Sequence, residues 1–572
     1  MTPERLRWGL GGLALLVSAV VVSAAFTAIP HTGGDNAGYI ALAHGLLTDG
    51  AYLDVFDPER MKHTKYPPVF PGLLAIMIAF GARTWSTLKF AAAIPTVLAV
   101  GATYVWAERR VGPWAAFGIA ALLTMSSGIV YYSHWVLSDP LFLALTMLAL
   151  AAFAMSEAAL PGSDDDPEGA GEPPGGRTAL VWLIVGVSAT GLAYFTRSAG
   201  LPMVLALFGW LALDRRWKAL AGSAAGLGVP MLAWWLRGRG DGVAQYGTEF
   251  WMVNPYDPAR GTIGVFGLLP RIVENASSYV FQHGPAGIVG AGGPALSTIG
   301  IVLALVALVG WGLSVRERIG VAEIFFPLYT GLILVWPTVW GGDRFALPLY
   351  PLVFLYAAVV VRTLGRRLPP AAVPAIGAVA LLSLLLPAAG NWLDGNQQNG
   401  MCDTVAAEQG PWACYGARIG YFVLAASWTS DGLPDGAAVL SRKPRHFYLL
   451  SGHPSRTFPF ESDPAAHLEL ADQVGARYVL LDQWDGQAGR FVGSAVTQRP
   501  DAFCYVGGFG QPNEGGAQLL GILPPELRSQ SAGGEAGAGI QSCPAGYTAP
   551  GRDGEVAYSS STTIPLLESL DS

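Results

Sequence analysis

The chain has 572 residues, of which 52% are hydrophobic and 13% are charged, and its formal net charge is -7. Soluble domains carry about 25% charged residues, so a chain this apolar could not cover its surface with polar groups in water. A lipid bilayer is the solvent that fits this composition. The sequence has no basic tail and no basic stripe with interleaved aromatic residues, which excludes nucleic acid as an expected partner.

Apolar runs long enough, or nearly so, to cross the roughly 30 Å of hydrocarbon in a bilayer recur along the first 390 residues. The eleven runs are residues 8–28, 90–107, 111–132, 140–156, 178–195, 199–213, 219–236, 295–315, 321–340, 345–361 and 374–389. The first could be a signal peptide, but its apolar core is longer than such a peptide usually has. We interpret it as a retained helix and predict a polytopic α-helical membrane protein with about eleven transmembrane helices.

The apolar stretch 67–81 is not counted among the spans, because it follows a charged loop and contains Pro67, Pro68 and Pro71. Counting it would place the Arg109-Arg110 pair outside and invert every later loop. We expect this stretch to lie in, or dip into, the outer membrane interface.

Positive charges are dense in every second loop, and such loops face the cytoplasm. These clusters are Arg5/Arg7, Arg109/Arg110, Arg215/Arg216/Lys218, Arg316/Arg318 and Arg362/Arg366/Arg367. The long loops 30–89 and 237–294 then face outward, and eleven crossings from a cytoplasmic N-terminus place the C-terminal domain outside the cytoplasm. We therefore expect a multi-pass protein of the plasma (inner) membrane.

The cysteines are consistent with this orientation. Cys402, Cys414, Cys504 and Cys543 all follow residue 400, and their spacing lacks the CxxC pairs of a zinc site. An even number confined to one region favours disulfides in an oxidising compartment. Three pairings are possible, of which Cys402 with Cys414 and Cys504 with Cys543 is favoured. Four free thiols in a cytosolic domain are the alternative.

Loop 157–177 is acidic and rich in proline and glycine, so we expect it to be disordered on the cytoplasmic side. Its Asp164-Asp165-Asp166 run offers the DxD pattern that holds a metal and a nucleotide sugar. No flanking strands could build a nucleotide fold around that run, so a solvated acidic linker is the preferred interpretation.

Residues 390–525 alternate strand and helix patterns, which predicts an extracytoplasmic α/β domain. Strands are expected at 437–442 and 477–482, a helix between Asp463 and Gly475, and a hairpin around 511–516. Residues 526–572 are rich in glycine, alanine and serine, and we expect a flexible tail there. Residues 1–389 form the transmembrane part.

The first outward loop begins His31-Thr-Gly-Gly-Asp35-Asn-Ala-Gly-Tyr39. An amphipathic helix is expected to follow, with Tyr39, Ile40, Ala43, Leu46 and Leu47 on one face. Asp35 near its start either caps the helix or takes part in chemistry. The loop continues with a cationic cluster that suits a lipid phosphate, although interfacial snorkelling would also explain it. The charged residues of this stretch are Asp54, Asp57, Arg60, Lys62, His63 and Lys65, followed by Tyr66-Pro67-Pro68.

Further ionisable residues fall at the outer ends of later spans, namely Asp139, Arg197 and Arg344. Ionisable groups beside or within spans are costly and usually face a cavity or a partner. Their convergence with Asp35 on one side of the membrane predicts a functional site there.

The ordered motifs GDNAGY, KYPPVFPG, WVLSDP and DRFALP resemble those of the GT-C superfamily of membrane glycosyltransferases. Within it, the pattern is most similar to protein O-mannosyltransferases and lipid A aminoarabinose transferases, over roughly residues 1–390. The resemblance implies Asp35 as general base and Asp139 as a second site carboxylate. It implies Lys65 and Arg344 as phosphate ligands. The remaining candidates for substrate binding are His63, Tyr66 and Arg197.

Asn36 stands where many relatives have a second acidic residue. The sequence therefore does not support a metal held by paired carboxylates, and no cofactor is assigned, although a divalent metal is possible. The resemblance implies transfer of a hexosyl or pentosyl group, with inversion, from a polyprenyl-phosphate sugar. The acceptor would be a hydroxyl of a lipid, glycan or protein on the outer side of the membrane.

Three other classes of function are compatible with the sequence. A lipid-linked glycan transporter or flippase would usually show paired repeats with broken helices, and none is visible. A noncatalytic subunit on the same scaffold differs only in activity. A metal-dependent hydrolase could use His31, His63, His134 and Asp139, but no HExxH spacing supports it.

Overall fold

The structure is a computed structural model that describes residues 2–159, 174–239, 245–257, 260–291, 295–369, 372–511, 515–528, 540–549, 562–568 and 570. The chain divides into two compact units. The first unit comprises Met1–Phe26, Thr64–Phe70 and Lys89–Asn399, and the second comprises Thr27–His63, Pro71–Leu88 and Gly400–Ser572. The second unit therefore includes most of the loop 30–89 as well as the C-terminal region.

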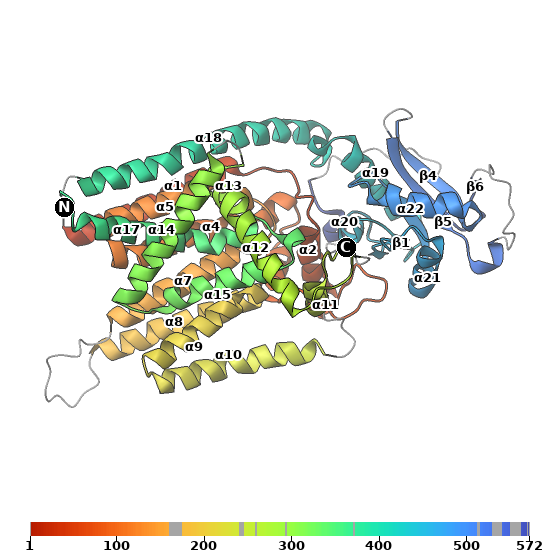
Figure 1. Cartoon of the computed structure of the whole chain (residues 1–572). Helices are drawn as coiled ribbons and strands as arrows, with labels where there is room; N and C mark the ends of the chain where they lie inside the picture. Colours follow the sequence, from red (N-terminus) through yellow and green to blue (C-terminus); the bar gives the residue numbers. More distant parts are fainter. Residues whose placement is uncertain are drawn as a thin grey trace. The chain divides into compact units, whose positions relative to one another are not determined.

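The first unit is a helical bundle (Figure 1). Its longer helices are α1 (Pro3–Ala25), α4 (Trp85–Val111), α5 (Pro113–Met125), α7 (Asp139–Ala158), α8 (Pro174–Thr196), α9 (Leu201–Leu213), α10 (Trp217–Arg237), α12 (Leu268–Ser278), α14 (Leu296–Glu317), α15 (Val321–Val335), α17 (Tyr350–Gly365) and α18 (Ala372–Gln409). Shorter elements are α6 (Ser127–Tyr132), η1 (Ser198–Gly200), α11 (Gln245–Trp251), η3 (Val265–Gly267), η4 (Tyr279–His283), α13 (Gly284–Val289), η5 (Thr338–Trp340), α16 (Asp343–Ala346) and η6 (Leu347–Leu349). The boundary between the units falls within α18.

Among the described residues, eight helical segments are long and apolar enough to cross a membrane. They include α1, α4, α7, α8, α10, α14, α18 and the segment Asp343–Gly365. The other three predicted spans fall on the shorter apolar helices Pro113–Met125, Ser198–Leu213 and Val321–Val335. The prediction of a multi-pass helical membrane protein is confirmed, while the count of eleven stays a prediction.

The predicted spans 111–132 and 321–340 are each interrupted for a local chemical reason. In the first, α5 ends at Met125 and α6 starts at Ser127, and the Ser126 hydroxyl donates to the Leu122 carbonyl at 2.7 Å. In the second, α15 ends at Val335 just before Trp336-Pro337. The residue before a proline is pushed away from helical geometry, so a helix usually ends there.

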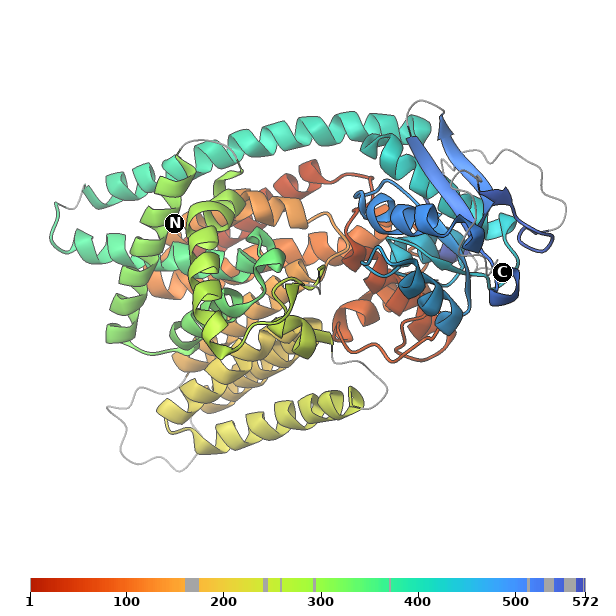
Figure 2. The ribbon, with the colours of Figure 1, turned by 45° about the vertical axis from the view of Figure 1, so that its right-hand side comes forward.

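Small residues set the distance between helices of the bundle. A Cβ on Gly310 of α14 would lie 2.1 Å from the carbonyl oxygen of Tyr356 in α17, so only glycine permits this approach. Close backbone contact at small residues is how helices associate in lipid. Large apolar side chains such as Leu305 and Val309 on α14 are more than half exposed and face the membrane instead. Figure 2 shows α10 at the edge of the unit beside α9.

The second unit contains a six-stranded mixed sheet of order β2-β1-β3-β5-β4-β6. Its strands are β1 (Ala438–Leu440), β2 (Ser455–Arg456), β3 (Ala476–Leu481), β4 (Phe503–Gln511), β5 (Gly515–Ile522) and β6 (Gln541–Ser542). Its other elements are α2 (Gly34–Thr48), α3 (Val69–Ala79, shared with the first unit), η7 (Ala413–Tyr415), α19 (Ala417–Gly432), α20 (Pro444–Ser451), α21 (Pro464–Val474), α22 (Gln487–Gln498), η8 (Pro500–Ala502), η9 (Pro525–Leu527) and α23 (Pro565–Glu568).

The sequence signals of the C-terminal region correspond to these elements. The Asp463 side chain caps α21 by accepting from the Ala465 amide at 2.9 Å, and Gly475 ends the helix with φ 67°. That left-handed conformation suits glycine, which has no Cβ penalty there. The predicted strands become β1 and β3, and the predicted hairpin becomes the antiparallel pair β4 and β5. The α/β class of this region is confirmed.

The expected amphipathic character of the helix after Asp35 is wrong. The helix exists as α2, but residues Asn36 through Gly45 are all buried, whereas Leu47 is 39% exposed. Alanine and glycine make up much of α2, and the helix is packed against α20. Such small residues let neighbours approach on every side, so an apolar stripe is not needed for burial.

The structure forms two disulfides, Cys402–Cys414 and Cys504–Cys543, the pairing favoured from the sequence. The second one attaches the described residues 540–549 to β4. Tyr547, Ile564 and Leu567 are buried as well, so these parts of the expected flexible tail are anchored. Of loop 157–177, residues 160–173 lie outside the described residues, including the Asp164-Asp165-Asp166 run.

Removal of Cys504–Cys543 is expected to lower the free energy of unfolding of the second unit by about 2–5 kcal/mol. Cys504–Cys543 joins residues 39 positions apart, whereas Cys402–Cys414 joins residues 12 positions apart. Because the longer loop loses more chain entropy in the unfolded state, we expect its removal to cost about 1 kcal/mol more stability. Thermal unfolding of the two double alanine variants measures the difference. An equal or smaller loss for the longer loop would contradict this expectation.

Candidate active site

The first unit contains a buried carboxylate joined to two arginines. Asp139 is 4% exposed and occupies the first position of α7, followed by Pro140, which starts a helix well because it needs no amide partner. One Asp139 oxygen lies 2.6 Å from an Arg197 guanidinium nitrogen, and the other accepts from Arg344 Nε at 2.7 Å. The structure thus brings together three residues that the sequence predicts from distant loops.

The two arginines come from irregular segments between helices. Arg197 separates α8 from η1 in an extended conformation, and Arg344 is in the single turn of α16. Arg197 also donates to the Ser138 hydroxyl at 3.3 Å and packs on the Phe345 ring at 5.5 Å. Each guanidinium carries five N–H donors in a fixed plane, more than one carboxylate oxygen can accept. The cluster can therefore recognise an anion such as a phosphate.

Asp343 is a second carboxylate at this cluster and was not among the predicted site residues. Its Oδ1 accepts from the Tyr132 hydroxyl and from the Arg344 amide, each at 3.0 Å. A Cβ on Gly128 would lie 3.2 Å from the other carboxylate oxygen, so glycine leaves room for it. Its position at the start of a span, directly before Arg344, is the signal that could have identified it.

Lys65 is paired with a carboxylate that the sequence did not indicate. Its ammonium lies 3.0 Å from the nearer Glu249 oxygen and 5.1 Å from the Trp340 ring centre. Arg271 fixes the chain next to Glu249 by donating to the Phe250 and Met252 carbonyls at 2.6 and 2.7 Å. A contact between residues 184 positions apart has no local sequence signal. Tyr66, in the same unit, is 6% exposed.

Lys89 is a further buried cation that sequence reasoning treated only as a loop end. It is fully buried, and its ammonium lies 4.6 Å from the Trp135 ring centre and 5.8 Å from that of Phe26. A lysine held over aromatic faces retains part of the stabilisation that water would give its charge.

The remaining predicted residues belong to the second unit. Asp35 is half-buried in the first turn of α2, whose N-cap is Gly33. The cap position itself is therefore Gly33, whose amide donates to His31 Nδ1 at 2.8 Å. His63 is 2% exposed, and its Nδ1 lies 2.7 Å from Asp54 Oδ1.

No group of three or more histidine, cysteine, aspartate or glutamate side chains with the geometry to hold a metal occurs in the described part of the chain. The arginines and lysine described above can recognise an anion, and a carboxylate can accept a proton.

Comparison with known proteins identifies the class. Residues 61–237 match the family model for dolichyl-phosphate-mannose-protein mannosyltransferase. The oligosaccharyltransferase of Archaeoglobus fulgidus, solved with a tethered acceptor peptide, superposes with a TM-score of 0.55 at 14% identity, over 90% of this chain and 75% of that one. The same enzyme with an inhibitory peptide and dolichol-phosphate gives 0.54 at 15% identity, over 91% and 74%.

ArnT from Cupriavidus metallidurans, solved with undecaprenyl phosphate, gives a TM-score of 0.52 at 14% identity, over 91% of this chain and 99% of that one. No functionally curated protein matches the sequence. The fold is that of the GT-C superfamily, as predicted, and the family model agrees with it. The prediction of a GT-C membrane glycosyltransferase is thus supported by the fold and by the family model over residues 61–237.

Proposed function

We propose that the protein transfers a sugar from a polyprenyl-phosphate donor to an acceptor hydroxyl on the outer side of the membrane. The observation that carries the proposal is the buried bridge from Asp139 to Arg197 and Arg344. Complexes of fold relatives with dolichol-phosphate and undecaprenyl phosphate support this class of donor. Such a donor is anchored in the bilayer by its lipid, so the enzyme needs to hold only its phosphate and sugar.

In this proposal Arg344 and Arg197 bind the donor phosphate, with Lys65 as a further ligand. As the bond from the anomeric carbon to the phosphate oxygen breaks, negative charge grows on the departing phosphate. Cations fixed in place stabilise that charge without reorganisation. Both Asp139 oxygens are engaged by arginines, so we assign Asp139 to positioning the two guanidiniums instead of to proton transfer.

Asp35 is the proposed general base. It accepts the proton of the acceptor hydroxyl while that oxygen forms the new bond to the anomeric carbon. Its place in the first turn of α2 favours the ionised carboxylate, because the amino end of a helix carries partial positive charge. Attack opposite the leaving phosphate would invert the anomeric centre.

Activity is tested with purified protein in nanodiscs, supplied with polyprenyl-phosphate hexoses and pentoses and a panel of lipid, glycan and peptide acceptors. Formation of a glycosylated acceptor from one of these donors is the expected result. Activity with a nucleotide sugar, and with none of the lipid donors, would contradict the proposal.

The proposal places the N-terminus in the cytoplasm of a cell with the protein in its plasma membrane, and the C-terminal region outside. A membrane-impermeant maleimide applied to intact cells should label the cysteines of the two disulfides only after reduction. Lysed cells give the total reactive thiol as control. Labelling that requires lysis even after reduction would place this region in the cytoplasm and reverse the orientation.

A further inference from the structure

The sheet of the second unit has a switch point between β1 and β3. The chain leaves β1, passes through α20 and adds β2 on one side of β1, then passes through α21 and adds β3 on the other side, all three strands being parallel. In open α/β sheets the two connections diverge at such a point and leave a crevice at the carboxyl ends of the strands. Ligands bind in that crevice.

The residues at this edge are polar, charged and aromatic. Arg442 and Lys443 lie just after Ser441 at the end of β1, and Asp482, Trp484 and Asp485 lie in the segment that follows β3. Arg442 lies 2.7 Å from Asp485, and the Lys443 ammonium lies 5.4 Å from the Trp484 ring centre. Two cations and two carboxyl groups give a formal sum of zero, which favours a neutral ligand over a phosphate.

The buried carboxyl group of Asp482 is the observation that indicates a ligand-binding site. It is 2% exposed, and its Oδ1 accepts from the Trp484 amide at 2.8 Å, whereas its Oδ2 has no hydrogen-bond partner among the described residues. Burial raises the pKa of this carboxyl to about 6. A buried polar atom without a partner is costly, and in native proteins it commonly marks a functional position.

The same edge adjoins the segment that carries Asp35. In α20, which starts right after Lys443, the His446 Nε2 lies 3.2 Å from the His31 carbonyl, and an Arg445 nitrogen lies 3.5 Å from the Gly34 carbonyl. A Cβ on Gly38 would lie 3.0 Å from that Arg445 nitrogen, so glycine lets α20 approach α2 closely. The start of α2 and the carboxyl edge of the sheet thus belong to one packed region of the second unit.

We propose that the carboxyl edge of β1 and β3 binds a neutral saccharide, the acceptor of the transfer reaction, with Trp484 against the sugar ring and Asp482 accepting from a hydroxyl. The acceptor role rests on the proposed function; the binding site does not. An aromatic face and a carboxyl acceptor together suit a sugar ring, which has an apolar face and a rim of hydroxyl donors.

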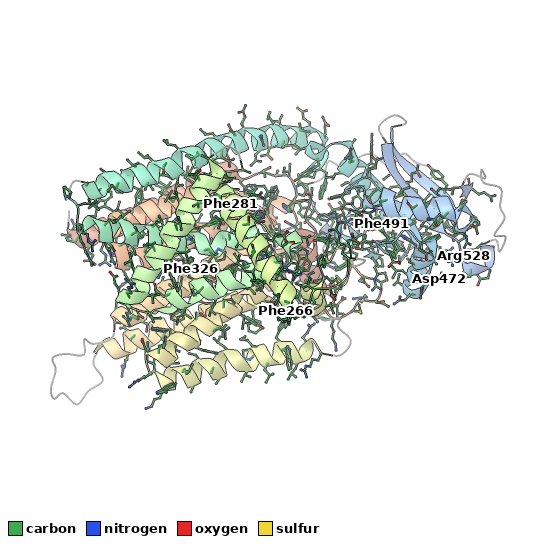
Figure 3. All side chains as sticks on the ribbon, in the orientation of Figure 1. Phe266, Phe281, Phe326, Asp472, Phe491 and Arg528 are labelled. Carbon is green, nitrogen blue, oxygen red and sulfur yellow. A yellow bond between two sulfur atoms is a disulfide. The ribbon has the colours of Figure 1, made fainter. Side chains whose placement is uncertain are left out.

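The test is saturation-transfer NMR and calorimetry on the full-length protein in nanodiscs, with a panel of methyl hexosides, methyl pentosides and their disaccharides and with no donor lipid present. Asp482→Asn keeps the oxygen that caps Trp484 and replaces the unpartnered one with a donor, and Trp484→Leu removes the aromatic face. Each is expected to weaken binding at least about tenfold, the equivalent of about 1.4 kcal/mol. Asp472→Asn is the matched control, because Asp472 is an exposed aspartate of the same unit paired with Arg528 (Figure 3).

Binding that Asp472→Asn retains and both edge variants lose supports the site. Absence of saccharide binding, equal binding by all variants with unchanged thermal unfolding, or binding of a serine/threonine peptide instead would overturn it. Saccharide binding without any turnover would leave the site standing and refute the proposed function. With turnover established, an acceptor KM that neither edge variant changes would refute the acceptor role alone.

Discussion

Replacing Asp35 with asparagine is expected to lower turnover by a factor of about 100 or more, with donor binding and thermal stability retained. A neutral amide cannot take the acceptor's proton, and general-base catalysis contributes about 10²–10⁴ in rate. The structure makes this substitution informative, because Gly33 and not Asp35 is the N-cap of α2. Loss of the first-turn charge alone would cost about 0.3–1 kcal/mol of stability and leave turnover nearly unchanged.

Glu4→Gln is the matched control for Asp35→Asn, since Glu4 is also an acidic residue in the first turn of a helix, α1. It is expected to retain turnover. Turnover and binding of polyprenyl phosphate are measured on the same nanodisc preparations. Normal turnover in Asp35→Asn would remove Asp35 from the mechanism and require another proton acceptor.

Arg344→Ala is expected to lower kcat/KM for the donor by an amount equivalent to about 1.5–3 kcal/mol of transition-state stabilisation. This is the contribution of one charge-assisted hydrogen bond. The fold should tolerate this change, because Asp139 keeps Arg197 at 2.6 Å and is not left as an unpaired buried charge. Arg344→Lys keeps the charge but not the planar donor fork, so we expect only partial recovery.

Arg528→Ala is the matched control for Arg344→Ala, because Arg528 also pairs with an aspartate, Asp472 at 2.7 Å, but belongs to the second unit, whereas Asp139 belongs to the first. Donor titrations at fixed acceptor give the two kcat/KM values. An Arg344→Ala protein with unchanged kcat/KM for the donor would show that Arg344 only balances Asp139.

Much of the fold could be predicted because the signals are local. Hydropathy indicated the positions of the spans, and the Asp463 and Gly475 caps indicated the ends of α21. The all-round burial of α2 could not be predicted, because it depends on α20, a helix some 400 residues away in the chain. The break between α5 and α6 at Ser126 could not be predicted either, because the sequence stays apolar on both sides of it.

Part of the site could be predicted from the free-energy cost of placing ionisable side chains at the ends of membrane spans. Asp139, Arg197 and Arg344 could be chosen because ionisable residues at the ends of spans need partners, and the structure pairs them. The partner of Lys65 could not be predicted, since Glu249 lies in α11 of the separate segment 237–294 and no sequence pattern links the two positions. Their pairing is decided by tertiary packing.

The most direct test of the central claim is a transfer measurement in sealed proteoliposomes with a donor labelled in both the sugar and the lipid phosphate. We expect sugar on the acceptor and free polyprenyl phosphate to appear in equal amounts, and Arg344→Ala to lower both together. Movement of intact donor across the bilayer without release of polyprenyl phosphate would contradict it and identify a transporter instead.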